Sequence, residues 1–471
     1  MTKSTGSSAS NTFLLVPIIL FFALLIVAVL RNQNLLTSAG LGSAVIVATP
    51  LILATYALMA QAIAGRGSID LSIGPLIGFI NVTLVQLYGA DIISSPVPFF
   101  LAAFLLGIAY QLAMGLIIVF VRVQPIIVSL SGYLALSGIN LVILERPGGT
   151  VPEWMSSWGL GMSVFSPVAV ILVLSTLAWV LFSRSAFFGH LRLMGSDERA
   201  AYASGVRIGI VRLGAHVISG IYAALAALTY TSLIGSGDPS QGTTYTLIAI
   251  TALVLGGTSL AGGRGGVVGS LLGAVNIYLI GFVLGTLNFG AVQSFVTDLS
   301  YGVILVLSLL LTVVLPRIQN VVRGISPLLL FVALSAVAGG VAIHSTYDYS
   351  APAAPAQSST AAPAAATGGE AGATVVKTPA NLTQFMFEDS GAELGGFGAR
   401  STLAGPLTLG AVMLLALVIL LRTMVSQVRA KPASLVVSIV AACVVALGVY
   451  AVARPSHPVA GGAAAPAQAE Q

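Results

Sequence analysis

Two glycine-rich polar stretches interrupt the long apolar segments of this sequence, and they hold the residues best placed to do chemistry. The first, residues 65–74, reads Gly-Arg-Gly-Ser-Ile-Asp-Leu-Ser-Ile-Gly, and the second, residues 255–266, reads Leu-Gly-Gly-Thr-Ser-Leu-Ala-Gly-Gly-Arg-Gly-Gly. Irregular backbone beside a membrane is tolerated only where protein or a water-filled path satisfies its peptide groups. The two stretches therefore predict a gate or translocation path, built from Asp70, Ser72, Gly74, Gly256, Gly257, Thr258 and Ser259.

The composition predicts the class of protein. Hydrophobic residues make up 57% of the 471 residues and charged residues only 7%, and the mean hydropathy is +1.02. A chain of this composition cannot form a water-soluble surface, so we expect an all-α, polytopic helical membrane protein. The net charge of +5 comes from basic residues spread over short loops, where membrane orientation explains them and nucleic-acid binding is not expected.

Apolar segments long enough to cross a membrane, which takes about 20 residues, predict ten helices before residue 318. They are 12–30, 42–63, 71–90, 98–121, 125–144, 166–182, 209–232, 245–262, 267–286 and 296–315. If the N-terminus is cytoplasmic, the basic loops all lie inside, as the positive-inside rule expects. These loops hold Arg66, Arg122, residues 184–207, Arg264 and residues 317–323.

The composition of the chain changes after this core. We predict a cytoplasmic tail (1–11), the ten-helix core (12–318), an additional span (319–345), an extracytoplasmic linker (346–400), two more helices (401–453) and a low-complexity tail (454–471). The linker is rich in Ala, Pro, Ser and Gly, a composition that cannot bury a core and predicts disorder.

The first stretch contains an acidic residue, Asp70, and a candidate helix cap, Ser72. A charged Asp70 at the centre of a bilayer costs about 2.5 to 3.5 kcal/mol, so we expect it at a helix break near the cytoplasmic face. Ser72 is placed to cap the next helix, with Pro75 in its first turn. Two interpretations remain open: a tight polar turn in which Asp70 caps backbone amides, or a gate or hinge near the pore.

The second stretch leads into Gly265, Gly269 and Gly273. Their spacing of four places them on one helix face, where another helix can approach closely. Packing alone explains these three glycines, and a role in the path is the alternative.

The longest loop on the inward side, residues 195–206, predicts a short helix with Ser196 as its cap, acidic residues in the first turn and Gly205 as its end. Such a helix on the membrane surface suits docking to a peripheral protein, and a self-contained solvated loop is the alternative. The residues that would serve docking are Gly195, Asp197, Glu198, Arg199, Ala200, Tyr202 and Gly205.

Polar residues inside the predicted spans are candidates for lining a path for a hydroxyl-rich solute, although interhelical hydrogen bonding explains each equally well. The main candidates are Asn81, Gln86, Asn140 and Asn276, with Gln111, His216 and Asn288 also inside spans. Ionisable residues at mid-membrane are scarce, which argues against an ion-coupled secondary transporter of a small polar solute. We predict no catalytic residues, cofactor or metal, and the sequence has no phosphate-cradling motif, so ATP-driven transport would need a separate ATPase.

Three motifs in order resemble the permease subunits of bacterial ribose-type sugar ABC importers: residues 67–74, 195–206 and 254–265, with residues 124–130 similar to a further family stretch. The resemblance covers about residues 10–318 and implies a multi-pass protein of the bacterial plasma (inner) membrane. It implies alternating access for a monosaccharide or related small polyol, driven by a cytoplasmic ABC ATPase subunit that docks on residues 195–206. It also implies a second permease copy or homologue and an extracytoplasmic sugar-binding protein, and the chain departs from it after residue 318.

Overall fold

A computed structural model of the chain describes residues 14–159, 165–240, 242–287, 289, 292–322, 331, 334–335 and 337–338. Across these residues the regular elements are helices, and the strand-like contact is a single bridge between Gly148 and Gly237. The prediction of an all-α helical membrane protein is confirmed. The tail 1–11, Asn288, the linker 346–400, the helices 401–453 and the tail 454–471 lie outside the described residues, as does most of the span 319–345.

Each of the ten predicted segments corresponds to a helix. They are α1 (Leu15–Arg31), α2 (Ser38–Ala64), α3 (Ile73–Gly89), α4 (Pro96–Leu116) with its π-helical continuation η3 (Ile117–Val121), α5 (Pro125–Ile143), α7 (Pro167–Phe182), α10 (Ile208–Ile234), α11 (Gly242–Leu255), α12 (Val267–Gly285) and α13 (Gln293–Val322). Four short elements were not predicted with these bounds: η2 (Gln33–Leu36), α6 (Glu153–Gly159), α8 (Ala186–Ser196) and α9 (Glu198–Ala203).

Five of the described helices are long and apolar enough to cross a membrane, namely α2, α4 with η3, α5, α10 and α12. A sixth span results if α7 and α8, which meet at a bend of 73°, are counted together. The remaining apolar helices α1, α3, α11 and the apolar part of α13 are shorter. The multi-pass class is therefore clear, whereas ten complete spans remain a prediction.

The largest errors in the predicted boundaries are at the ends of two helices. The helix expected to reach residue 262 ends at Leu255, because the chain turns at Gly257, which has a φ of 81°. The helix expected to end at residue 315 continues to Val322, so the predicted domain boundary at residue 318 and most of the basic loop 317–323 fall within a helix. A helix need not end where its apolar stretch ends.

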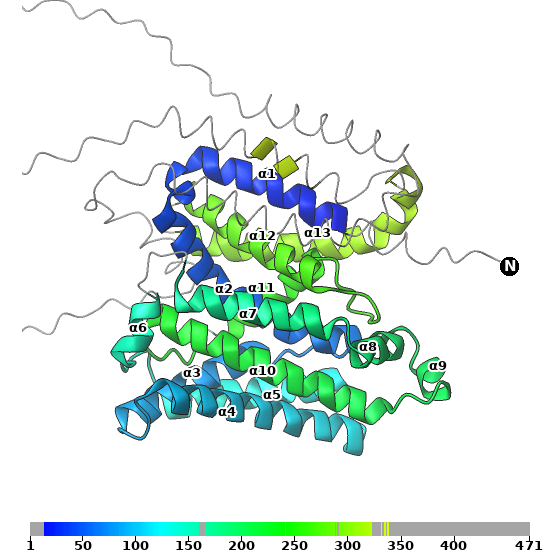
Figure 1. The fold of residues 1–471 in the computed structure, drawn as a ribbon, viewed down its shortest axis with the longest axis horizontal. Helices are drawn as coiled ribbons and strands as arrows, with labels where there is room; N and C mark the ends of the chain where they lie inside the picture. The colour runs from blue at the N-terminus through cyan, green and yellow to red at the C-terminus, as the bar shows by residue number, and fades with distance from the viewer. Residues whose placement is uncertain are drawn as a thin grey trace, which may run out of the picture.

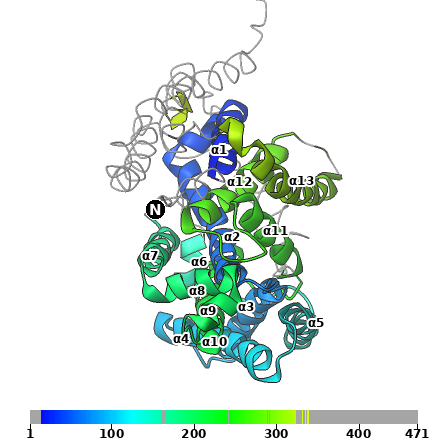
Figure 2. The ribbon, with the colours of Figure 1, turned by 90° about the vertical axis from the view of Figure 1, so that its right-hand side faces the viewer.

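The helices run roughly side by side, and α10 packs most extensively against α2 and α4 (Figures 1 and 2). The apolar window of α2 is 78% buried and that of α10 is 72% buried, against 22% for α4 and 28% for α5. Thus α2 and α10 form the centre of the bundle, and α4 and α5 present apolar side chains outward, as contact with membrane lipid requires.

The two loops predicted on opposite sides of the membrane lie at opposite ends of the bundle. With a cytoplasmic N-terminus, the same count of spans places the loop 145–158 outside, and α6 lies mostly within it, whereas α8 and α9 lie in the loop 184–207, predicted inside. Figure 1 shows α6 at one end of the long axis and α9 at the other. A membrane normal along this axis therefore separates the two loops as the charge distribution predicts.

Candidate functional site

The first break begins with a sharp turn at the end of α2. Gly65, Arg66 and Gly67 have φ values of 77°, 57° and 69°, so three successive residues are left-handed. Glycine adopts this conformation freely, but a left-handed non-glycine residue costs about 1 to 2 kcal/mol. Arg66 therefore holds a strained position that the surrounding structure must maintain.

Beyond this turn, the Asp70 carboxylate is buried, with only 3% of the residue exposed. Its Oδ1 accepts hydrogen bonds from the backbone N–H of Ser72 at 2.8 Å and from the Ser72 hydroxyl, and its Oδ2 accepts from Nε2 of Gln61 at 3.3 Å and from Nε2 of Gln111. The predicted helix break is present, and the carboxylate is buried beside α2 and α4. Four donors replace water there, which makes the burial of the charge tolerable.

This buried polar cluster extends to α10 through Gln111. The Oε1 atom of Gln111 accepts from Nε2 of Gln61 at 2.9 Å and lies 3.0 Å from Nδ1 of His216. Because an amide oxygen can only accept, the hydrogen bond requires the proton on Nδ1 of His216. The cluster thus joins the first break to α2, α4 and α10.

Ser72 occupies the cap position of α3, but its side chain makes no capping hydrogen bond to the helix. The predicted cap is therefore wrong, because the hydroxyl donates to Asp70 instead. Pro75 does lie in the first turn, as predicted.

Gly74 lets the start of α3 touch the start of α11. A β-carbon on Gly74 would lie 1.7 Å from the carbonyl oxygen of Gly242. The backbone N–H of Gly74 donates to Oγ1 of Thr246 at 3.0 Å, and that hydroxyl donates to the carbonyl of Leu71 at 3.1 Å. The first break is therefore fixed to α11 as well.

The second break joins α11 to α12 through close glycine contacts. A β-carbon on Gly256 would lie 2.2 Å from the carbonyl oxygen of Gly269, and one on Gly273 would lie 2.0 Å from that of Ala252. The predicted close approach is confirmed for Gly269 and Gly273. Gly265 departs from the prediction, because it precedes the helix with a φ of 154° and faces Thr258.

The polar residues of the second break bond within it or to α12. Oγ1 of Thr258 lies 3.4 Å from Oγ of Ser270, and the backbone N–H of Ser259 donates to the carbonyl of Arg264 at 3.0 Å. Thr258 is 1% exposed. These contacts hold the loop in one shape against the start of α12.

The loop 195–206 contains the predicted short helix, now α9, but its cap is Asp197 and not Ser196. Asp197 Oδ1 accepts from the backbone N–H groups of Arg199 at 2.9 Å and Ala200 at 3.1 Å. Ser196 still belongs to α8 and donates to the carbonyl of Arg192. Gly205, with a φ of 85°, follows the helix as predicted.

The first break, the loop 195–206 and the second break meet at one glycine junction, formed by Gly65, Gly195, Gly262 and Gly263. A β-carbon on Gly195 would lie 1.8 Å from the carbonyl oxygen of Ile63, and one on Gly262 would lie 2.4 Å from Cα of Gly65. The backbone N–H of Gly263 donates to the carbonyl of Ile63 at 3.0 Å. The end of α2, the end of α8 and the second break thus touch through their backbones.

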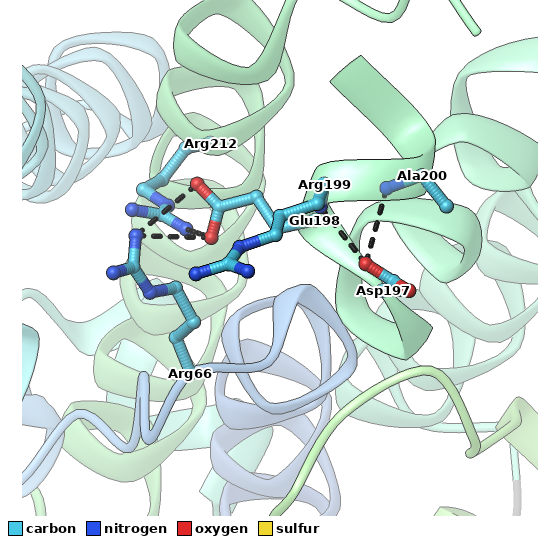
Figure 3. A network of polar contacts seen from close by, with 6 residues as sticks. All are labelled: Arg66, Asp197, Glu198, Arg199, Ala200 and Arg212. Atoms are coloured by element: carbon cyan, nitrogen blue, oxygen red, sulfur yellow. Dashed lines mark hydrogen bonds and ion pairs between the residues drawn. The ribbon is translucent and has the colours of Figure 1, made fainter. Parts of the chain in front are cut away.

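An ion-pair network lies beside this junction (Figure 3). Nη1 of Arg66 lies 3.0 Å from Oε2 of Glu198, and Nη2 of Arg212 lies 3.3 Å from the same oxygen. The side chain of Arg66 is 66% exposed, that of Glu198 23% and that of Arg212 10%. Glu198, on α9, therefore links the turn after α2 to the first turns of α10.

The four main pore-lining candidates each bond another helix or loop through a side-chain amide. Asn81 donates to Thr231 Oγ1 (2.9 Å) and the Ser236 carbonyl (3.0 Å), Gln86 to the Ile143 carbonyl (2.9 Å), Asn140 to the Pro75 carbonyl (3.0 Å) and Asn276 to the Pro17 carbonyl (2.9 Å). These contacts favour interhelical bonding for all four, and pore lining stays a prediction.

Sequence reasoning missed Gln61 and the pairing of Arg66 and Arg212 with Glu198. No local pattern signals these contacts, since Gln61 lies within an apolar helix and the three charges come from the turn after α2, from α9 and from α10. The three motifs themselves were found, but not that they touch.

Comparison with known proteins matches residues 41–315 to a family described as branched-chain amino acid transport system / permease component. The ribose import permease protein of Escherichia coli K12 is 30% identical over 249 residues, which cover 51% of this chain and 76% of that protein. The ribose import permease protein of Bacillus subtilis 168 is 30% identical over 250 residues, or 52% and 76% of the two chains. An autoinducer 2 import system permease protein of E. coli O9:H4 is 25% identical over 250 residues, or 51% and 74%.

No solved structure matches the chain. The family match spans more than half of the sequence and includes both helix breaks, the loop 195–206, most of the central helix α2 and all of α10. The resemblance to ribose-type importer permeases is confirmed by these relatives. The chain therefore belongs to the family of transport-system permease components, as a multi-pass helical membrane protein.

Proposed function

We propose that this chain is the transmembrane subunit of an ATP-binding cassette importer, which carries a monosaccharide or related small polyol by alternating access. The observation that carries the proposal is the glycine junction, where the loop 195–206 touches both helix breaks through its backbone. A movement imposed on that loop must displace the breaks, because close-packed backbone has low compressibility and transmits strain.

Helix α9 and its flanking residues form the docking site for the ATPase. Gly195, Asp197, Glu198, Arg199, Ala200, Tyr202 and Gly205 belong to one loop at an end of the bundle. The Tyr202 side chain is prominent there, since the residue is 76% exposed. A large aromatic residue exposed on a capped helix suits insertion into a groove of a peripheral protein.

The two breaks serve as the gate. Asp70 and Gly74 fix the first break to α2, α4 and α11, and Ser72 donates to the Asp70 carboxylate within the break. Gly256, Gly257, Thr258 and Ser259 form the turn of the second break, against α12. Non-helical backbone that is held by discrete side-chain contacts can exchange one arrangement for another, as hinge residues in loops and at the ends of helices do.

The remaining partners follow from this role. A second permease copy or homologue completes the path, and an extracytoplasmic sugar-binding protein delivers the solute at the end of the bundle that carries α6. The relatives are named for import of ribose and of autoinducer 2, which supports a small hydroxyl-rich solute. The location is the bacterial plasma (inner) membrane, with α8 and α9 on the cytoplasmic side.

The proposal is tested by comparing cells that contain the chain with cells that lack it, for accumulation of a panel of labelled monosaccharides and polyols that includes D-ribose. The difference between the two strains should disappear when ATP is depleted. The difference in accumulation should remain when a protonophore is added and the ATP concentration is held constant. The labelled solute that shows the difference identifies the substrate.

A second candidate, an ion-coupled secondary transporter of a small polar solute, gains one observation. The buried Asp70 carboxylate is linked to His216 through Gln111, and buried ionisable groups are typical of ion-coupled carriers. In that case the protonophore would abolish uptake, whereas depletion of ATP at a constant ion gradient would leave uptake unchanged.

A further inference from the structure

We infer that Glu198 is a positioning residue with one fixed and one releasable contact: it stays bound to Arg212 and releases Arg66 when the first break moves. The inference deepens the proposed function, on which it rests, by naming side chains that connect α9 to the gate. It concerns the pairing of Glu198 with Arg66 and Arg212, which the sequence motifs do not reveal.

The contact with Arg212 is the fixed one. The Arg212 side chain is 10% exposed, and its Nε has no hydrogen-bond partner in the described part of the chain. Glu198 is therefore the carboxylate that compensates a largely buried guanidinium. Removing one partner of a buried ion pair leaves an uncompensated charge, which is strongly unfavourable. Arg212 thus keeps α9 attached to the beginning of α10.

The contact with Arg66 is the releasable one. The Arg66 side chain is 66% exposed, and solvent-exposed ion pairs contribute little to stability. Its backbone is left-handed, with a φ of 57°, so part of the pairing energy is offset by strain in the turn. The balance between pairing and strain makes this the contact that breaks first.

The turn that Arg66 occupies leads directly to the gate. The backbone N–H of Ser68 donates to the carbonyl of Gly65 at 3.2 Å, and that of Ile69 donates to the carbonyl of Gly67 at 2.8 Å. Only three residues separate Arg66 from Asp70. When Glu198 holds Arg66, the turn is fixed and the carboxylate stays in its cluster, and when Arg66 is free the segment 66–70 can leave the bundle.

Ser68 provides a reporter for this movement. It is 4% exposed, and its hydroxyl has no hydrogen-bond partner among the described residues. Ser68→Cys is therefore nearly isosteric and breaks no bond. In the full-length chain with Cys443→Ala, which removes the natural cysteine, the rate of reaction with a water-soluble maleimide reports how often the segment opens.

The experiment measures this rate in native membranes of cells that lack the partner ATPase. Arg66→Gln should raise the rate about 1.5- to fivefold, the range that corresponds to loss of an exposed ion pair. Arg66→Lys, which keeps the charge, should react as the parent does. Arg207→Gln removes an exposed arginine at the start of α10 and should leave the rate unchanged. Glu198→Gln should raise the rate more than Arg66→Gln does.

The double variant Arg66→Gln/Glu198→Gln should react no faster than Glu198→Gln alone, because both changes remove the same contact. Additive effects of the two substitutions, or a parent-like rate in Arg66→Gln, would overturn the inference. The measurement uses no ATPase and no solute, so its failure would leave the proposed importer function untouched. Failure of ATPase docking would likewise leave this result unchanged.

Discussion

Gly65 and Gly195, which are 130 positions apart in the sequence, pack backbone against backbone: a β-carbon on Gly65 would lie 2.9 Å from Cα of Gly195. A side chain at either position would collide with neighbouring backbone, and Gly65 is in addition left-handed, with a φ of 77°. Through this contact the loop that carries α9 touches the end of α2 where the first break begins. It is the structural basis of the coupling that we propose.

Gly195→Ala should disrupt this contact. The new methyl group would lie 1.8 Å from the carbonyl oxygen of Ile63, so α8 must move away from α2, at a cost of about 1 to 3 kcal/mol. Gly189→Ala is the matched control, since Gly189 lies in the same helix with nothing within 4 Å of its β-carbon position. Thermal unfolding in detergent should show a lower midpoint for the first variant alone, and equal midpoints would contradict the account.

Asp70→Asn should destabilise the protein by about 2 to 4 kcal/mol, through loss of charge-assisted hydrogen bonds and the approach of donors to the new amide. Whichever way the amide points, its N–H₂ group faces a donor from Ser72, Gln61 or Gln111. Asp91→Asn, at an exposed left-handed position that Asn tolerates, is the control. Chemical denaturation of the two variants compares them directly, and parent-like stability of Asp70→Asn would show that the carboxylate charge is not needed.

Gln111→Leu should be nearly as damaging, because Gln111 is the residue that joins the Asp70 carboxylate to His216. In a double-mutant cycle with Asp70→Asn, the two changes should be non-additive by about 0.5 to 3 kcal/mol. Gln86→Leu removes a single exposed bond to the Ile143 carbonyl and should cost less. Strict additivity of the Asp70 and Gln111 changes would mean that the cluster does not act as a unit.

Tyr202→Ala should weaken docking of the ATPase without changing the fold. The residue is 76% exposed, so its removal costs little in stability, whereas a large exposed aromatic side chain at an interface contributes strongly to binding. Pull-down of the ATPase with the variant chain measures the effect, and circular dichroism checks that the helices remain. Undiminished capture of the ATPase would remove Tyr202 from the docking site.

The positions of the helices could be predicted because apolar length and loop charge are local properties of the sequence. All ten predicted core segments correspond to helices. Glycine explains two of the errors: α11 ends at Leu255 because the chain turns at Gly257, and Gly265 lies outside α12 although its spacing matches the helix face.

The site could be predicted only in part, because its members come together through tertiary contacts. Each motif was visible as glycine-rich backbone or as a capped helix, but the meeting of Gly65, Gly195 and Gly262 depends on how α2, α8 and the second break pack. Side-chain competition explains the two incorrect caps. Ser72 donates to Asp70 instead of capping α3, and Asp197 takes the position that a sequence pattern gives to Ser196.

The most direct test of the proposed function is to extract the chain from its own cells in mild detergent and identify the proteins that copurify in stoichiometric amount. We predict a cytoplasmic ABC ATPase, together with a second permease copy or homologue, and loss of the ATPase from the Tyr202→Ala preparation. A chain that copurifies with no ATPase, transports its solute alone and stops when the ion gradient collapses would contradict the account.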